Sequence, residues 1–113
     1  MRRQVIILPQ AEQDIERNAL WWAEHHDRDE AARWVEMVFR KLERLAENAE
    51  TYALAPENDQ FDVEIRQLLL GVGSRPTHRA IYRIHGDRVE VLTIRSARQD
   101  VLSPDDVEAG EHD

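Results

Sequence analysis

The sequence lacks cysteine entirely and holds only four glycines, four prolines and a single lysine among 113 residues. Without cysteine, a disulfide scaffold, a thiolate zinc site and a thiol nucleophile are all excluded, and a reducing compartment is favoured. No apolar run approaches the roughly 20 residues of a membrane span. Met1, Arg2 and Arg3 precede too short an apolar stretch for a signal peptide. We therefore expect a complete, cytoplasmic protein that contacts no membrane.

Charged residues are abundant, at 34% of the chain, with a net charge of -8. Residues 11–64 carry 15 acidic and 6 basic side chains, and residues 99–113 carry six acids and no base. Residues 65–98 reverse this balance, with seven arginines against two acids. Because the rigid fork of arginine suits phosphate and carboxylate groups, this reversal predicts one cationic region on an otherwise acidic protein.

Apolar residues recur at helical spacing in the first half of the chain. A short β-prone run over residues 4–8 ends at Pro9, and a first helix is expected from Ala11 to Ala23. Asp27 offers an N-cap, with Glu30 placed as in a capping box. A second helix is expected over residues 29–49, with an apolar stripe of Ala31, Val35, Val38, Leu42, Leu45 and Ala49, widened by Phe39 and Ala46. The two helices should pack as an antiparallel hairpin.

The pattern changes from helical to alternating after a loop over residues 50–62. Strands are expected over residues 64–70, 79–85 and 88–95, and Gly86-Asp87 is a strong hairpin signal between the last two. The sequence thus predicts an α+β fold: an N-terminal strand, an α-helical hairpin, and a three-stranded antiparallel sheet covered by that hairpin. We expect one domain over residues 1–100 and a flexible acidic tail over residues 101–113.

Histidine and tryptophan give weaker signals for a site. His25 and His26 are adjacent, so they point in different directions on a helix and make a poor metal pair. The helical spacing of Trp21, Trp22 and Trp34 favours core packing over a stacking platform. No metal and no cofactor are expected.

Six segments, in this order, resemble the RelE/ParE superfamily of toxins from bacterial type II toxin–antitoxin systems. They are similar to the family's entry into its first helix, its two helix cores, an arginine-centred strand, and its last two strands: Leu8–Ile15, Trp21–Ala23, Ala31–Trp34, Glu64–Leu68, His78–Ile84 and Val89–Arg98. The resemblance covers residues 4–100. It implies a toxin, of the kind also called a plasmid stabilisation protein, that a cognate antitoxin holds inactive in a hetero-oligomer.

The resemblance leaves two targets open. ParE-like members inhibit DNA gyrase without hydrolytic activity of their own, whereas RelE-like members cleave messenger RNA on the ribosome without a metal. For RNA cleavage, the cations that would stabilise the charged phosphorane are Arg66, Arg79 and Arg98. RelE-like enzymes usually carry a tyrosine, histidine or lysine near the last strand or shortly beyond it, and this chain has Ser96, Gln99 and Asp100 there. We therefore favour gyrase, with ribosome-dependent RNA cleavage as the alternative and a non-toxic member that only binds its antitoxin as the second alternative.

Contact with the antitoxin or the target is expected to fall on the cationic region, through Arg66, Arg79, Arg83, Arg95 and Arg98. A basic sheet would suit an antitoxin segment that carries carboxylates. The other interpretation is that each arginine simply pairs with an acid of the helices, which would stabilise the fold only slightly.

Overall fold

The computed structural model describes residues 2–73 and 75–97; Arg98 and the predicted tail lie outside the described residues. The elements follow one another as β1 (Gln4–Ile7), α1 (Pro9–His25), α2 (Arg28–Glu43), α3 (Leu45–Asn48), the 3₁₀ turns η1 (Ala49–Thr51) and η2 (Asn58–Gln60), β2 (Ile65–Leu70), β3 (His78–His85) and β4 (Arg88–Ser96). Among these residues, no helix combines the length and the apolar character that crossing a bilayer requires.

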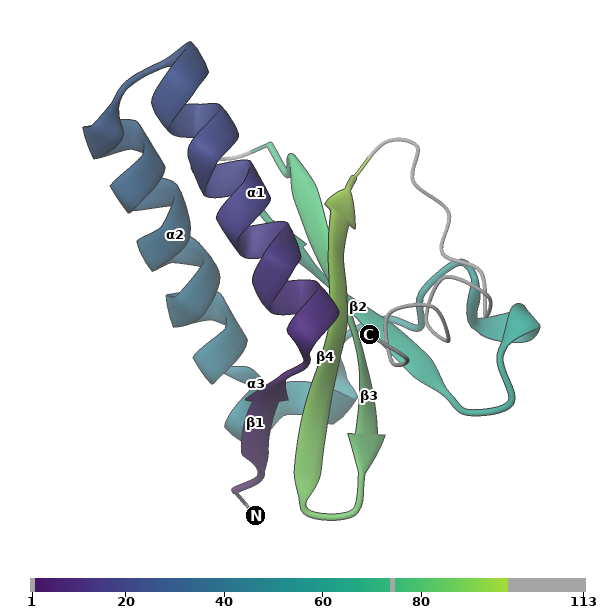
Figure 1. Ribbon diagram of the computed structural model, residues 1–113. Coiled ribbons are helices and arrows are strands. Elements are labelled where there is room, and N and C mark those ends of the chain that lie inside the picture. The colour runs from purple at the N-terminus through teal and green to yellow at the C-terminus, as the bar shows by residue number, and fades with distance from the viewer. Residues whose placement is uncertain (1, 74, 98–113) are drawn as a thin grey trace.

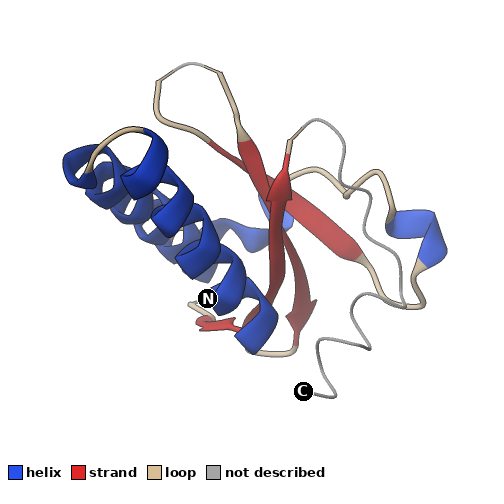
Figure 2. Cartoon of the chain, turned by 45° about the horizontal axis from the view of Figure 1, so that its top comes forward, coloured by secondary structure: helices blue, strands red, loops and turns tan. Residues whose placement is uncertain are grey.

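The strands form one sheet in the order β1-β4-β3-β2, and the hairpin of α1 and α2 covers one of its faces (Figures 1 and 2). The predicted α+β class is confirmed, and β2, β3 and β4 are antiparallel as expected. The N-terminal strand is not separate from this sheet, because β1 pairs in parallel with β4. The two helices between β1 and the rest of the sheet supply the long crossover that parallel pairing needs.

Local signals in the sequence place the ends of several elements. Asp27 caps α2 by accepting a hydrogen bond from the backbone N–H of Glu30 at 2.8 Å, as predicted. The Glu30 side chain instead pairs with His26 at 3.1 Å. Gly86 takes a positive φ of 61° in the β3–β4 turn, as a type II′ hairpin requires at its first central residue.

The second helix is shorter than the pattern predicts. It ends at Glu43, and the chain turns at Arg44 into α3, so the expected single helix over residues 29–49 is wrong. The turn brings the carbonyl of Ala46 to the backbone N–H of Arg3, which donates to it at 2.7 Å beside β1. Phe39 does not widen the apolar stripe: it is exposed, because α2 turns Trp34 and Met37 into the core.

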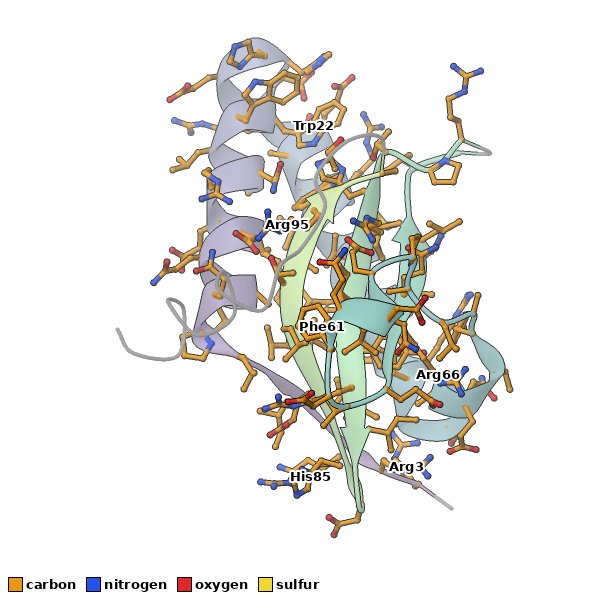
Figure 3. All side chains as sticks on the ribbon, turned by 90° about the vertical axis from the view of Figure 1, so that its right-hand side faces the viewer. Arg3, Trp22, Phe61, Arg66, His85 and Arg95 are labelled. Carbon is orange, nitrogen blue, oxygen red and sulfur yellow. The ribbon has the colours of Figure 1, made fainter. Side chains whose placement is uncertain are left out.

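Apolar residues are buried on both faces of the sheet. Under the helices, the largest buried side chains include Trp34, Leu42 and Tyr82, and the Tyr82 hydroxyl donates to the carbonyl of Ala49 at 2.6 Å. Burial raises the pKa of Tyr82, which keeps this hydroxyl protonated. On the outer face a smaller cluster consists of Ala55, Ile65, Ile81 and Leu92, against which Leu8 and Phe61 pack. Phe61 is seen in front of the strands in Figure 3.

A buried carboxylate attaches α1 to the sheet. Asp14 is 1% exposed, and its Oδ2 accepts hydrogen bonds from the Thr93 hydroxyl at 2.5 Å and the Ile94 backbone N–H at 3.0 Å. Its Oδ1 accepts from Gln10 Nε2 at 2.9 Å and from Arg17 at 2.6 Å. Four donors, one of them charged, thus replace the water that this carboxylate loses on folding.

The strand segment that Asp14 holds is irregular. Tyr82 pairs with Val91 and Ile81 with Thr93, so Leu92 is an extra residue in β4. Such a bulge changes the direction of the side chains that follow it. Here Leu92 belongs to the outer cluster, while Val91 and Ile94 both pack under the helices.

His78 extends the contact between α1 and the sheet. Its Nε2 lies 3.1 Å from Asn18 Oδ1, and its Nδ1 lies 2.9 Å from the Thr77 hydroxyl. Asn18 Nδ2 donates to the carbonyl of Asp14 at 2.8 Å, which orients the amide oxygen towards the histidine. A neutral ring that donates from Nε2 and accepts at Nδ1 satisfies all of these groups. Burial lowers the pKa of His78, in agreement with a neutral ring.

We predict that Asp14→Asn lowers the free energy of unfolding by about 2–4 kcal/mol, because an amide cannot accept from all four donors. Chemical denaturation measures the change. Asp27→Asn is the matched control: it makes the same substitution at the exposed N-cap, where asparagine serves as well as aspartate, and should change stability by less than about 0.5 kcal/mol. Equal effects of the two substitutions would contradict the role assigned to Asp14.

The lowered pKa of His78 predicts a loss of stability in mild acid. Between the folded-state pKa and the ordinary histidine pKa of 6.5, the unfolded chain binds more protons than the folded chain. The contribution of His78 to the free energy of unfolding is therefore fully present above pH 6.5. It is lost as the pH drops towards the folded-state pKa. Denaturation from pH 8 to pH 5 should show a steeper decline for the unmodified chain than for His78→Gln, and parallel curves would contradict this.

Candidate functional site

Three of the predicted arginines lie on the outer face of the sheet, away from the helices. Arg79 and Arg95 face each other across β3 and β4, and Arg83 follows four residues after Arg79 on the same strand. Residues at even spacing on a strand share a face, so these three belong together, as the sequence predicts. Arg98 lies outside the described residues.

Arg79 is engaged in a buried ion pair. Its guanidinium donates to both carboxylate oxygens of Glu57, one contact being 2.8 Å, and to Gln67 Oε1 at 3.3 Å. Arg79 is 6% exposed and Glu57 is 3% exposed. The pair attaches the loop after η1 to the outer face of the sheet. This geometry gives Arg79 a structural contact, and its predicted role in binding stays a prediction.

Arg83 also has an acidic neighbour, directly opposite it on β4. Its Nε donates to Glu90 Oε1 at 2.7 Å, and the pair is partly exposed. The hydrogen bond from Arg83 lowers the pKa of Glu90, so the carboxylate is charged at neutral pH. Arg95 is half-buried near the end of β4, in a different part of the sheet from Arg66 (Figure 3). Arg83, Arg95 and Arg88, which pairs with His85 across the β3–β4 hairpin, are therefore cations of this face that reach its surface among the described residues.

Arg66 lies on the opposite face. Arg66 shares a face of β2 with Leu68 and Leu70, which follow it at even spacing and pack under the helices. Its guanidinium donates to the carbonyl of Tyr52 at 2.5 Å and to Glu64 Oε1 at 2.8 Å. Arg66 and Arg79 are therefore on different faces of the sheet and do not converge on one phosphate.

A groove runs between α2 and the edge of β2 (the α2–β2 groove), and none of the described arginines predicted for binding is among its lining residues. It consists of three hollows of about 260, 380 and 340 Å³. Adjacent hollows share lining residues: the first two share Arg33 and Val72, and the last two share Lys41. Among the described lining residues, the cations along the groove are Arg33, Arg40 and Lys41 of α2, and Arg44, which directly follows that helix.

The signal for this groove is present in the sequence but is local to one helix. Arg33, Arg40 and Arg44 are spaced seven and four residues apart, which places them along one side of a helix. Counting charge over residues 11–64 hides them, because that segment is acidic as a whole. Only a separate reading of each helix face would have found them.

The three tryptophans have different environments. Trp34 is buried and Trp22 packs partly against the core, so the prediction of core packing is confirmed for these two. It is wrong for Trp21, which is 47% exposed and stacks on His25 with ring centroids 4.5 Å apart. Among the residues that the structure describes, no three histidine or acidic side chains come together as metal ligands would.

Comparisons with known proteins identify the fold. Residues 5–101 match the family model of the ParE toxin of the type II toxin–antitoxin system parDE. A solved structure described as the chromosomal ParDE toxin–antitoxin system from P. aeruginosa is similar, with a TM-score of 0.68 and 19% sequence identity. The similarity covers 84% of this chain and 96% of that one. No curated protein matches the sequence.

We predict that Glu57→Gln lowers the free energy of unfolding by about 3 kcal/mol, because it leaves the Arg79 charge buried without its counterion. Replacing both partners, with Glu57→Leu and Arg79→Met, should recover most of that loss. Thermal and chemical denaturation measure both variants. Glu47→Gln is the control, because Glu47 forms an exposed pair with Arg2 and should change stability by less than about 0.5 kcal/mol. A double variant less stable than Glu57→Gln would contradict the prediction.

Proposed function

We propose that this chain, which belongs to the ParE toxin family of type II toxin–antitoxin systems, arrests growth by binding DNA gyrase and is neutralised by a cognate antitoxin. The observation that carries the proposal is the family match over residues 5–101, which spans every described helix and strand except the start of β1. The similar fold of the P. aeruginosa ParDE structure supports it independently of close sequence identity.

The outer face of the sheet is the surface that we assign to the target, and the antitoxin would cover it. Arg83 and Arg95 bring positive charge to this face, while Arg79 supports it from within through Glu57. The ion pair with Glu90 orients the Arg83 side chain, so less side-chain entropy is lost when a partner binds. A partner with surface carboxylates would complement such a face and associate faster at low salt.

The geometry of the described residues gives less support to RNA cleavage. That reaction requires cations around a single phosphorane, together with an acid and a base. Arg66 and Arg79 are on different faces and are both bonded to neighbouring protein groups. Gyrase inhibition without nuclease activity is therefore the function proposed here.

Expression of the chain in bacteria should arrest growth, and coexpression of the protein encoded by the adjacent reading frame should relieve the arrest. The purified chain should inhibit supercoiling by DNA gyrase and leave ribosome-bound messenger RNA intact. Cleavage of that RNA without gyrase inhibition would contradict the proposed target, and no growth arrest would contradict a toxin.

Reversing two charges tests the outer face. Arg83→Glu with Arg95→Glu should weaken gyrase inhibition about tenfold, because like charges would then oppose a partner that carries carboxylates. Arg2→Glu with Arg28→Glu changes the net charge equally at two exposed positions away from this face and serves as the control. The exchange Arg83→Glu with Glu90→Arg keeps the ion pair and shows whether a loss comes from the charge or from the fold. Equal inhibition by all variants would contradict the assignment of the face.

A further inference from the structure

We propose that two adjacent hollows of the α2–β2 groove together bind a purine nucleoside triphosphate, with the base beside Trp22 and the phosphates beside Arg40 and Lys41. This site does not depend on the proposed function. It follows from the contrast between the two hollows, from the cations that line one of them, and from the glycine turn that forms the other wall.

The two hollows form one continuous depression. The first hollow, of about 260 Å³, and the middle hollow, of about 380 Å³, share Arg33 and Val72 in their walls. From Glu30 in the first hollow to Lys41 in the middle one, α2 rises about 16 Å, at about 1.5 Å per residue. Small-molecule sites measure roughly 300–1,000 Å³, so the first hollow suits one part of a ligand whose other part occupies the middle hollow.

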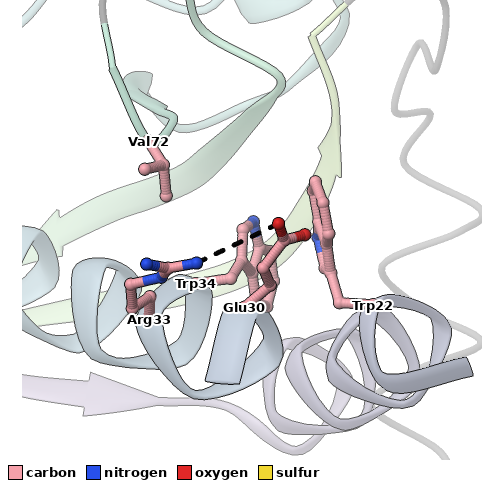
Figure 4. Close-up of a pocket in the computed structure, with 5 residues that line it drawn as sticks. All are labelled: Trp22, Glu30, Arg33, Trp34 and Val72. Atoms are coloured by element: carbon pink, nitrogen blue, oxygen red, sulfur yellow. Dashed lines mark ion pairs between the residues drawn. The ribbon is translucent and has the colours of Figure 1, made fainter. Parts of the chain in front are cut away.

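The first hollow has a mostly apolar wall. Trp22, Trp34 and Val72 line it, and Val72 is 61% exposed. Figure 4 shows Trp22 on one side of the hollow, with Val72 and Arg33 on the other. A flat ring placed between an indole and a valine side chain would lose water from both of its faces. Because nucleobases stack on aromatic side chains in this way, the first hollow suits a base.

Acidic and basic side chains give the ligand its direction. The Glu30 carboxylate lies in the first hollow, 4.0 Å from Arg33. It would repel a phosphate, but it can accept from the amino group of adenine or guanine. The middle hollow carries Arg33, Arg40 and Lys41 against one acid, Glu36, among its described lining residues. The phosphates are therefore favoured in the middle hollow and the base in the first.

The cations of the middle hollow lack the counterions that other arginines have. Arg40 and Lys41 form no ion pair or side-chain hydrogen bond with any residue that the structure describes. Counterions are abundant, because residues 11–64 carry 15 acids. Adjacent cations without a counterion create a positive local potential, which an anion of several charges would lower. Elsewhere, ion pairs engage Arg2, Arg3, Arg17, Arg66, Arg79 and Arg83.

The other wall of the middle hollow is a turn with glycine at two positions. Gly71, Val72 and Gly73 follow β2 and line the hollow. A Cβ at Gly71 would lie 2.6 Å from the carbonyl oxygen of Arg75, and Gly73 has a φ of 90°, which favours glycine. At Gly73 a Cβ would meet no atom of the described residues within 4 Å. Neither position carries a side chain that narrows the hollow, so a phosphate group can approach the backbone closely.

The charge of the whole chain favours a small anion over a large one. The net charge is -8, so a second copy of the chain or a strand of nucleic acid is repelled where it extends beyond the groove. A nucleotide stays close to Arg40 and Lys41. At physiological salt, charges farther away than about 8 Å are largely screened. The acidic remainder of the chain therefore opposes a nucleotide much less than it opposes a polymer.

Calorimetry with the intact chain separates the two halves of the ligand. Adenosine triphosphate or guanosine triphosphate should bind at least about tenfold more tightly than inorganic triphosphate, which lacks the base, and than adenosine, which lacks the phosphates. Equal binding of inorganic triphosphate would show attraction of polyanions only and would overturn the base site. Equal binding of adenosine would overturn the role of the cations. If neither nucleotide binds, the proposal is wrong.

Neutralising the two unpaired cations tests the phosphate end. Arg40→Gln with Lys41→Gln should weaken binding of the nucleotide at least about tenfold and flatten its dependence on salt. Arg2→Gln with Arg28→Gln is the control: it removes the same charge at two exposed positions outside both hollows and should change affinity less than about twofold. Thermal unfolding verifies that each variant is folded. Equal effects of the two pairs would overturn the phosphate site.

Substitution of an exposed valine tests the junction of the two hollows. Val72→Glu places an acid beside both parts of the ligand and should weaken binding of the nucleotide at least about tenfold. Val63→Glu makes the same change at a valine that is 49% exposed and lines neither hollow, and should change affinity less than about twofold. Similar losses in both variants would overturn the location of the site.

The methyl resonances of the same two valines give a readout without substitution. Those of Val72 should shift on addition of adenosine triphosphate and stay in place on addition of inorganic triphosphate, because only the base has an aromatic ring current. Those of Val63 should stay in place with both. A shift of Val63 alone would overturn the site. Growth arrest is measured separately, so this proposal and the proposed function can fail independently.

Discussion

The carboxylate of Asp14 holds the helical layer on the sheet, and the positions of both candidate surfaces depend on that contact. It accepts from Thr93 and Ile94 next to the extra residue of β4. A buried charge is tolerable only when every acceptor is used, so the contact permits very little variation in geometry. Through it α1, and with it α2, is fixed relative to β4. The width and direction of the α2–β2 groove therefore depend on the position that this contact gives to the helices.

The arginines show how far charge in a sequence can differ from charge on a surface. Residues 65–98 have a clear excess of positive charge, yet Arg79 is buried against Glu57, and Arg66 donates to a backbone carbonyl and to Glu64. By contrast, α2 belongs to an acidic segment but presents several cations to one groove. Because a helix separates neighbouring side chains by about 100° and a strand by about 180°, the sign of a surface depends on spacing more than on totals.

Much of the fold was predictable because its signals are local. The cap at Asp27 and the turn at Gly86 each depend on a few adjacent residues, and the change from helical to alternating pattern separates the two layers. The turn at Arg44 and the bulge at Leu92 were not predicted. Both occur where the chain contacts a segment far away in sequence, which is β1 at the turn and α1 at the bulge. A local sequence pattern carries no information about such contacts.

The amino-acid sequence by itself determined the α+β class, the order of the elements, the family and the set of cationic residues from which any binding surface must be made. The tertiary structure decided which of those cations form buried ion pairs and which reach the protein surface. The reason is physical: hydrophobic periodicity is written along the chain, whereas an ion pair such as Arg79 with Glu57, or a groove between a helix and a strand edge, exists only after segments far apart in sequence meet.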